Sequence, residues 1–414
     1  MALLSTLTIG CSEESGGADG DIRPTTSVLT GAEQLVSADF ESIQGMNVGL
    51  IVNHTSRIGD AHLIDVISKS EDVNLVALFG PEHGIRGDED AGAKIEDGID
   101  DETGVPVFSL YGANRRPTSE MLEGVDVLLF DIQDVGARFY TFISTMGLSM
   151  QSAAEANIPF VVLDRPNPLG GNAVEGFVLD TSFVSFVGQY PIPVRHGLTI
   201  GELAKMIQGE KWLPGLENLD LRVVEMSGWS RDMLWPDTGM NWIPPSPNLP
   251  TFETALMYPG TCYFEATTAS EGRGTDLPFL TFGAPWMDSG AVVTPNITGL
   301  NLVPGNITPI EMPGKSSSPK WKDEPINSVS IQITDAAKLQ PVSAGLEMIS
   351  RMYRAAPEEV RSSLFNERWM ALLGGTDLLT EMLKNNLNAA DFRAAWGEEI
   401  QEFGNQRSPY LIYD

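Results

Sequence analysis

Cysteine is nearly absent from this sequence, and so are long apolar runs. Only Cys11 and Cys262 occur among 414 residues, so no framework of disulfides can hold the fold together. A hydrophobic core must do so, and with 42% hydrophobic residues the chain is long enough for two domains with sizeable cores. Beyond the first ten residues, no stretch is apolar for long enough to cross a bilayer.

Positive charge is also scarce. The chain carries 26 basic against 56 acidic residues, which gives a formal net charge of -30. Such a surface repels nucleic acids and anionic lipid surfaces, so we expect no nucleic-acid partner. An anionic substrate would need a local group of arginines.

Several cofactor and metal motifs are missing. The first predicted strand is followed by Asn53-His54-Thr55-Ser56 and not by the glycine fingerprint of dinucleotide binding, and no Walker A loop occurs. We therefore expect no cofactor. No HExxH motif or comparable spacing is present either, and this argues against a metal site.

The N-terminal segment has a composition of its own. A short apolar run, MALLSTLTIG, precedes Cys11, and a polar, Gly-rich stretch follows it. This order predicts a lipoprotein signal and linker over residues 1–24, cleaved after Gly10 and acylated at Cys11. No Lys or Arg precedes the run and Thr8 replaces a preferred leucine, so an ordinary N-terminal tail is the alternative. The lipoprotein prediction implies export, to the periplasm or as a membrane-anchored protein.

Four short apolar runs of the first half are typical of parallel strands buried on both faces: VGLIV (48–52), LVALF (75–79), VLLF (127–130) and FVVL (160–163). Helix-like segments such as 61–70 and 147–157 alternate with them. This alternation predicts an α/β fold with a Rossmann-like parallel sheet.

The amino-acid composition changes near residue 190, at the Pro-rich stretch YPIPVRHGLTIGE. We place a domain boundary there, with a Rossmann-like catalytic domain over 25–190 and a smaller α/β auxiliary domain over 191–414. Thr199 and Glu202 have the spacing of a capping box, which predicts a helix running to about Gly209.

Polar residues follow all four predicted strands. In open α/β sheets ligands bind beyond the carboxyl ends of the strands, so side chains from several loops would meet at one edge. This arrangement is the main sequence argument for an enzyme. The candidates for substrate contact are Asn53, His54, Arg86, Arg138, Tyr140, Asp164, Arg165, His196, Glu265, Glu271 and Arg273.

Glu82 is the strongest catalytic candidate. Glycines and a proline hold its loop, GPEHGIRG, at the end of a strand, where a carboxyl could act as a general acid. Its neighbour His83 is a second catalytic candidate. The alternative is that Glu82 pairs with Arg86 and shapes the turn.

A second carboxylate would be needed for the usual cleavage of a glycoside. Asp131, Asp134, Glu265 and Glu271 are all candidates, and the sequence does not choose among them. For Asp131 the alternative is a helix cap or an ion pair with Arg138.

Three arginines, Arg138, Arg165 and Arg273, could bind an anionic group, since a guanidinium binds a carboxylate through two parallel hydrogen bonds. Internal ion pairs are the alternative for each. Tyr140 could stack on a sugar ring or pack in the core.

The motifs of these loops resemble a bacterial family, the NamZ-type exo-β-N-acetylmuramidases. The resemblance runs from about Val48 to Asp288 through VNHTS, LFGPEHGIRGDEDAG, PVFSLYGANRRPT, FDIQDVGARFYTFISTMG, VVLDRPNPLGG, YPIPVRHGLTIGEL, MNWIPPSPNLP and FEATTASEGRGTDLPF. It implies a Rossmann-like domain joined to a smaller α/β domain, with the active site in the cleft between them.

The resemblance also implies an activity: removal of terminal N-acetylmuramic acid (MurNAc) from the non-reducing end of peptidoglycan fragments such as MurNAc-GlcNAc saccharides, where GlcNAc is N-acetylglucosamine. The glutamate that this family needs in its PEHG motif is Glu82 here. The lactyl carboxylate of MurNAc would be the anion for an arginine. Where the family has Gly-Thr-Asn, this chain has Ala266-Thr267-Thr268, which leaves substrate preference open.

Three alternatives accompany this reading. The acetamido oxygen of the substrate could replace a carboxylate as the nucleophile. The chain could instead be a muropeptide-binding lipoprotein without catalysis. It could also be a metal-dependent hydrolase that uses His54, His83, Asp131 and Asp134.

Overall fold

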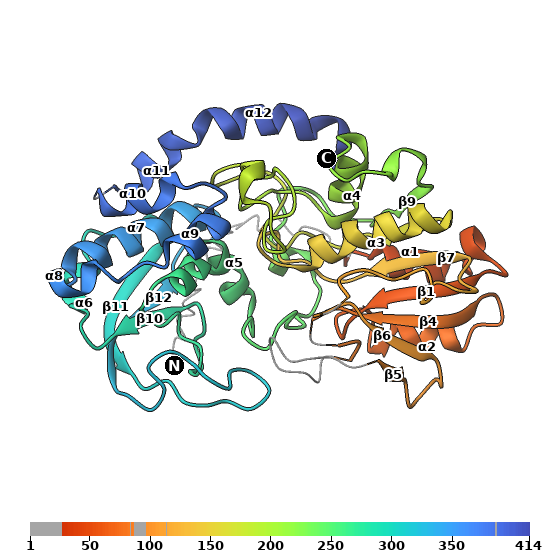
Figure 1. Cartoon of the computed structure of the whole chain (residues 1–414), viewed down its shortest axis with the longest axis horizontal. Coiled ribbons are helices and arrows are strands. Elements are labelled where there is room, and N and C mark those ends of the chain that lie inside the picture. The colour runs from red at the N-terminus through yellow and green to blue at the C-terminus, as the bar shows by residue number, and fades with distance from the viewer. Residues whose placement is uncertain (1–26, 83, 87–96, 113, 386) are drawn as a thin grey trace, which may run out of the picture.

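The computed structural model describes residues 27–82, 84–86, 97–112, 114–385 and 387–414. The described chain forms two lobes that lie side by side, one around a large sheet and one around a small sheet (Figure 1). In this part of the chain, no helix combines the length and the apolar character needed to cross a membrane.

The first lobe is built on a seven-stranded sheet in the order β5-β6-β4-β1-β7-β8-β9. All neighbouring strands are parallel except β5, which pairs antiparallel with β6. The four predicted strands are confirmed as β1, β4, β7 and β8, and the predicted Rossmann-like sheet is confirmed with them. The strands are β1 (Asn47–Val52), β4 (Asn74–Gly80), β5 (Gly98–Ile99), β6 (Pro106–Ser109), β7 (Val127–Asp131), β8 (Phe160–Leu163) and β9 (Leu221–Val224).

Helices cover both faces of this sheet because successive strand residues point to opposite sides. In β7, Leu128 and Phe130 pack with α3 (Phe142–Ala156) and α4 (Ile200–Gly209). Val127 and Leu129 pack on the other face, with α1 (Gly31–Ser37) and α2 (Leu63–Ser68). Strand order reverses between β1 and β7, and this is the point where ligands bind in such sheets.

Two local predictions met different outcomes. The capping box of Thr199 and Glu202 is present and starts α4, which ends at Gly209 as expected. The helix expected at 61–70 is shorter: β2 (Arg57–Ile58) and β3 (Ala61–His62) form a hairpin, and α2 starts only at Leu63.

The second lobe holds an antiparallel sheet in the order β10-β12-β11, packed against helices. Helices α5 and α7 cross closely at Gly260 and Gly345, where a Cβ on either glycine would lie about 2 Å from a carbonyl oxygen. The elements are α5 (Phe252–Thr261), β10 (Thr281–Ala284), α6 (Ser289–Val292), β11 (Leu300–Ile307), β12 (Ile326–Ile333), α7 (Pro341–Ala355), α8 (Glu358–Arg361), α9 (Glu367–Gly374), α10 (Leu378–Lys384) and α11 (Ala389–Ala395).

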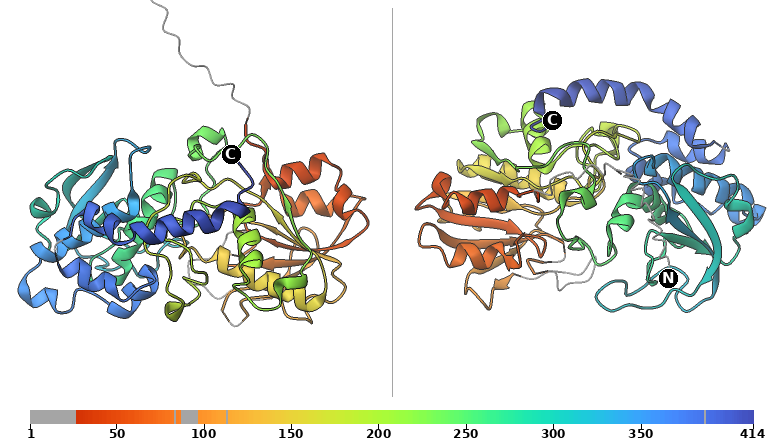
Figure 2. Two further views of the ribbon diagram at one scale, coloured as in Figure 1. Left: turned by 90° about the horizontal axis from the view of Figure 1, so that it is seen from above. Right: turned by 180° about the vertical axis from the view of Figure 1, so that it is seen from behind.

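The last helix, α12 (Gly397–Arg407), runs from the second lobe back to the first (Figures 1 and 2). The chain then stays on the first lobe, where the Tyr413 hydroxyl donates to Asp164 at 2.7 Å and the Ile412 amide donates to Glu202 at 2.9 Å. Helix α4 and strand β9, which follow residue 190, also belong to the first lobe. The boundary at residue 190 stays a prediction.

Candidate active site

Glu82 lies two residues beyond the end of β4 and lines a cavity of about 250 Å³. We call this the Glu82 cavity. Both lobes contribute to its wall, so it has the position that the sequence predicts for the active site. Its other lining residues are Phe139, Tyr140, Thr141, Phe142, Ser246, Asn248, Leu249, Tyr258, Arg273 and Phe279.

Two hydroxyl groups hold the carboxylate of Glu82. Thr141 Oγ1 donates to Glu82 Oε2 at 3.5 Å, and the Tyr111 side chain is also hydrogen-bonded to Glu82. Burial and the nearby charge of Glu82 raise the pKa of Tyr111 to about 12, so the phenol remains a donor at neutral pH. Sequence reasoning missed both residues, although each lies in a motif shared with the family.

Arg273 is the candidate arginine that lines the Glu82 cavity. Its Nη2 lies 2.6 Å from Glu265 Oε1, and its Nε lies 3.4 Å from Glu271 Oε1. Burial alone would lower the pKa of Arg273, but these two carboxylates raise it above its usual value. Lys320 adds a second cation, 3.1 Å from Glu271 Oε2. Glu265 and Glu271 therefore position Arg273 and do not line the cavity themselves.

Arg138 has a structural role instead of the predicted contact with a ligand. Its side chain is fully buried and donates to the carbonyl oxygens of Phe177, Ile192 and Leu373 at 2.6 to 2.9 Å. Burial lowers the pKa of Arg138 to about 10. Since Leu373 lies in α9, this arginine ties the second lobe to the first.

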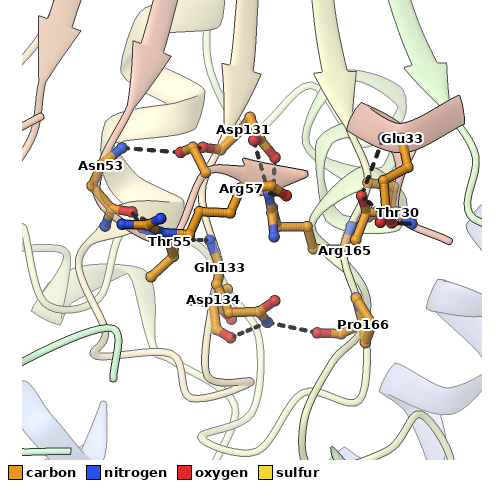
Figure 3. A network of polar contacts seen from close by, with 12 residues as sticks. Thr30, Glu33, Asn53, Thr55, Arg57, Asp131, Gln133, Asp134, Arg165 and Pro166 are labelled. Atoms are coloured by element: carbon orange, nitrogen blue, oxygen red, sulfur yellow. Dashed lines mark hydrogen bonds and ion pairs between the residues drawn. The ribbon is translucent and has the colours of Figure 1, made fainter. Parts of the chain in front are cut away.

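Asp131 and Arg165 form a buried ion pair with each other (Figure 3). Arg165 Nε and Nη2 donate to the two carboxylate oxygens of Asp131, and neither residue lines the Glu82 cavity. The charge of Asp131 is therefore used on Arg165, while the catalytic role of Asp131 and the substrate contact of Arg165 stay predictions. This ion pair corrects the alternative pairing of Asp131 with Arg138.

Asp164 is likewise buried and not available to a ligand. Its carboxylate accepts hydrogen bonds from Tyr413, Thr199 and the Gly201 amide, so it fixes the start of α4. Burial raises the pKa of Asp164 to about 6, although these hydrogen bonds oppose the shift.

A buried polar group lies behind the cavity wall. Asp134 accepts from the Gly136 amide at 2.7 Å, and its Oδ2 lies 3.7 Å from His196 Nε2. Tyr140 lines the cavity, and its buried hydroxyl has no hydrogen-bond partner among the described residues. Burial, Glu82 and Asp134 all raise the pKa of Tyr140. Of these predicted residues, Tyr140 lines the cavity, whereas Asp134 and His196 lie beside each other outside its lining.

The loop that carries Asp134 is held in place by its neighbours (Figure 3). The side-chain nitrogen of Gln133, Nε2, donates to the carbonyl oxygens of Asp134 and Pro166, at 2.8 and 2.7 Å. The backbone amide of Gln133 donates to Thr55 Oγ1 at 3.0 Å. Contacts of this kind join the loops after β1, β7 and β8 into one rigid edge.

The remaining candidates shape loops. Asn53 Oδ1 accepts from the amide and hydroxyl of Thr55, and His54 Nε2 lies 2.6 Å from the Pro244 carbonyl oxygen. Arg86 donates to Asp100 at 2.9 Å and to Asp65 at 3.3 Å.

His83 and Cys11 lie outside the described residues. Among the residues that the structure describes, no group of three or more His, Cys, Asp or Glu side chains is placed to hold a metal ion. The described members of the metal site suggested by the sequence have other neighbours, since Asp131 binds Arg165 and His54 meets Pro244.

Comparison with known proteins agrees with this architecture. The family model for the N-terminal part of the exo-beta-N-acetylmuramidase NamZ matches residues 48–253, and the model for its C-terminal part matches residues 256–413. The chain is 38% identical over 413 residues to the peptidoglycan beta-N-acetylmuramidase NamZ of Bacillus subtilis (strain 168), which spans 98% of this chain and 96% of that protein.

Two solved structures have a fold similar to that of this chain. Two DUF1343 family proteins of Bacteroides fragilis NCTC 9343 each cover 94% of this chain. One has a TM-score of 0.83 at 35% identity over 100% of its own length, and the other has 0.77 at 34% over 99%. From these matches over nearly its whole length, the chain belongs to the NamZ family of exo-β-N-acetylmuramidases.

Proposed function

We propose that this protein is a glycosidase that releases terminal MurNAc from the non-reducing end of peptidoglycan fragments, in cell-wall turnover or recycling. The observation that carries the proposal is that Glu82 and Arg273 line the same cavity. One is the carboxyl that the family motif predicts as the acid, and the other is a cation suited to the lactyl carboxylate. The Bacillus subtilis relative is a peptidoglycan beta-N-acetylmuramidase by name.

Arg273 would recognise the lactyl group through one hydrogen bond. Its Nε and Nη2 face Glu271 and Glu265, which leaves Nη1 without a partner among the described residues. A charge-assisted hydrogen bond from Nη1 to a carboxylate is stronger than one between neutral groups. The cavity would thereby prefer MurNAc over a hexosamine that lacks the lactyl ether.

Glu82 would protonate the glycosidic oxygen as the bond to the anomeric carbon breaks. Among the described residues that line the cavity, Glu82 is the single carboxylate. With the acetamido oxygen of the substrate as the nucleophile, no second carboxylate is needed. Glu82, now ionised, would then accept a proton from the water that hydrolyses the intermediate.

We further propose a site of action on the basis of the N-terminal sequence. A lipid on Cys11 would anchor the protein at a membrane and keep it in the periplasm, beside peptidoglycan fragments and MurNAc-GlcNAc saccharides. Labelling with a radioactive fatty acid, in the wild type and in Cys11→Ala, tests this part of the proposal. Incorporation that the variant retains would contradict acylation at Cys11.

The activity is tested by release of free sugar from a chromogenic β-N-acetylmuraminide and from MurNAc-GlcNAc, with and without a chelator. We expect release by the wild type that a chelator does not change. In Glu82→Gln, kcat should fall about 10²- to 10⁴-fold because the general acid is lost. The exposed Glu120→Gln is the matched control and should act as the wild type.

Three results would overturn parts of this proposal. Tight muropeptide binding without release by the wild type would indicate a binding protein. Undiminished release by Glu82→Gln would exclude Glu82 as the acid. Loss of activity with a chelator, restored by a divalent cation, would indicate a metal-dependent hydrolase.

A further inference from the structure

Asn248 lines the Glu82 cavity and was not a candidate from the sequence. It lies in the Trp- and Pro-rich loop MNWIPPSPNLP (240–250) and is only 3% exposed. A buried side-chain amide needs hydrogen-bond partners for both its oxygen and its nitrogen. Its partners therefore show what the cavity wall is able to bind.

One end of the Asn248 amide is bound and the other is open. The Nδ2 atom donates to the carbonyl oxygen of Lys315 at 2.8 Å. A carbonyl oxygen can only accept, so this contact fixes which end is nitrogen and leaves Oδ1 on the other side. Among the described residues, nothing donates to Oδ1. As far as the structure describes the chain, the cavity wall thus carries a neutral acceptor without a donor.

The loop around Asn248 is held at several points. The Leu249 amide donates to the Ser246 carbonyl at 2.9 Å, and Trp242 Nε1 donates to the Leu249 carbonyl at 3.1 Å. His54 contacts the carbonyl of Pro244 from the first lobe. These contacts keep Asn248 in place before a ligand enters, so little ordering is needed on binding.

We propose that Asn248 Oδ1 accepts the acetamido N–H of the bound sugar and directs the acetamido oxygen toward the anomeric carbon. This assignment rests on the proposed function. In MurNAc the glycosidic oxygen, the acetamido group and the lactyl ether are on consecutive ring carbons. Glu82, Asn248 and Arg273 line one cavity and match these three substituents in chemistry: an acid, an acceptor and a cation.

The acetamido oxygen forms a bond to the anomeric carbon while the bond to the leaving oxygen breaks, and Glu82 gives that oxygen its proton. The amide nitrogen gains positive charge in the cyclic intermediate, so its hydrogen bond to Asn248 becomes stronger. Water then attacks the anomeric carbon, the acetamido oxygen leaves, and Glu82 regains a proton. Since the contact is strongest near the transition state, it raises kcat more than it lowers KM.

The test measures kcat and KM of two enzymes, each on two substrates. The enzymes are the wild type and Asn248→Ala. The substrates are a chromogenic β-N-acetylmuraminide and its 2-acetoxy analogue, in which an ester oxygen replaces the N–H. We expect kcat on the acetamide to fall about 10- to 100-fold in the variant, the cost of a hydrogen bond to a charged group, with KM nearly unchanged. On the acetoxy analogue the two enzymes should agree within about twofold.

Further variants separate positioning from folding. Asn241→Ala alters an exposed asparagine of the same loop, outside the lining of the cavity, and should leave both substrates unaffected. Asn248→Asp keeps an acceptor oxygen for the acetamido N–H but sets its other oxygen against the Lys315 carbonyl oxygen, so it should loosen the loop more than Asn248→Ala does. Thermal unfolding of each variant shows whether the lost contact with Lys315 has loosened the loop.

An equal loss on both substrates, or no loss on either, would overturn the role of Asn248 and leave the proposed function intact. Absence of release from the acetamide by the wild type would overturn the proposed function, and the role of Asn248 with it. A loss confined to the acetamide supports both.

Discussion

Arg165 binds the carboxylate of Asp131 through two hydrogen bonds, with an Nε–Oδ1 distance of 2.5 Å and an Nη2–Oδ2 distance of 2.8 Å. Asp131 is the last residue of β7, and Arg165 comes two residues after the end of β8. The pair thus joins two neighbouring strand ends, with both side chains at most 4% exposed. Asp131 and Arg165 lie where the sequence predicts catalytic and substrate-binding groups, but in this structure their charges hold two loops together.

Asp131→Asn should therefore destabilise the fold more than it impairs the chemistry. It leaves the Arg165 charge buried and unpaired, so we expect the free energy of unfolding to fall by about 3 to 5 kcal/mol. Urea unfolding measures this loss. The kcat of the folded fraction should remain within about tenfold of the wild type, far above that of Glu82→Gln. A variant of normal stability but without activity would support the catalytic role of Asp131.

Arg273→Gln should change substrate selectivity. The variant loses the cation that faces the cavity and leaves Glu265 and Glu271 less well neutralised. We expect kcat/KM for a β-N-acetylmuraminide to fall about 10- to 100-fold, because a charge-assisted hydrogen bond to the lactyl group is lost. Any activity on the matching N-acetylglucosaminide, which has no lactyl group, should change much less.

The control for this experiment is Arg116→Gln, which removes an arginine that is 40% exposed and paired with Glu155. It should leave both substrates unchanged. If Arg273→Gln reduced activity on both substrates by the same factor, Arg273 would have only a structural role.

Asp164 makes a testable contribution to the pH dependence of stability. Its pKa is raised from 3.8 to about 6, so the folded state holds this proton more tightly than the unfolded state does. Below about pH 4 both states are protonated and the group has no effect. Between about pH 4 and pH 6 the unfolded state loses this proton while the folded state keeps it, and above pH 6 both states are deprotonated. Stability therefore falls, and the cost reaches about 3 kcal/mol above pH 6.

Asp164→Asn removes this titration and should keep most of the contacts. The Gly201 amide can still donate to the side-chain oxygen, and the hydroxyls of Thr199 and Tyr413 can accept from the new nitrogen. Measured by urea unfolding between pH 3.5 and 7.5, the variant should gain stability relative to the wild type as the pH rises. A difference that stays constant over this range would show that Asp164 does not titrate in the folded protein.

The large sheet and the position of Glu82 could be predicted because the information is local. Continuous apolar runs such as VGLIV and VLLF are typical of strands buried on both faces, and the capping box of Thr199 and Glu202 fixes where α4 starts. Glu82 follows such a strand in a loop held by Gly80, Pro81 and Gly84. Each of these patterns lies within about ten residues.

The partners of charged residues could not be predicted in the same way. Arg138, Arg165 and Arg273 look equivalent in the sequence, yet one binds backbone carbonyls, one binds a buried aspartate and one faces the cavity. These differences depend on contacts between segments that are far apart in the chain. Asn248 was missed for a further reason: an uncharged amide in a Pro-rich loop carries no sign of its function.

The return of the chain along α12 to Asp164 and Glu202 means that the two lobes are joined at both ends of the second lobe. Arg138 adds a third link, to the carbonyl oxygen of Leu373. Domains joined by one linker can swing apart to admit a ligand, whereas two connections oppose such a movement. We therefore expect a sugar to enter the Glu82 cavity through an opening that already exists. If the chain is cleaved at one of these two connections, the two pieces should still migrate together as one particle in gel filtration.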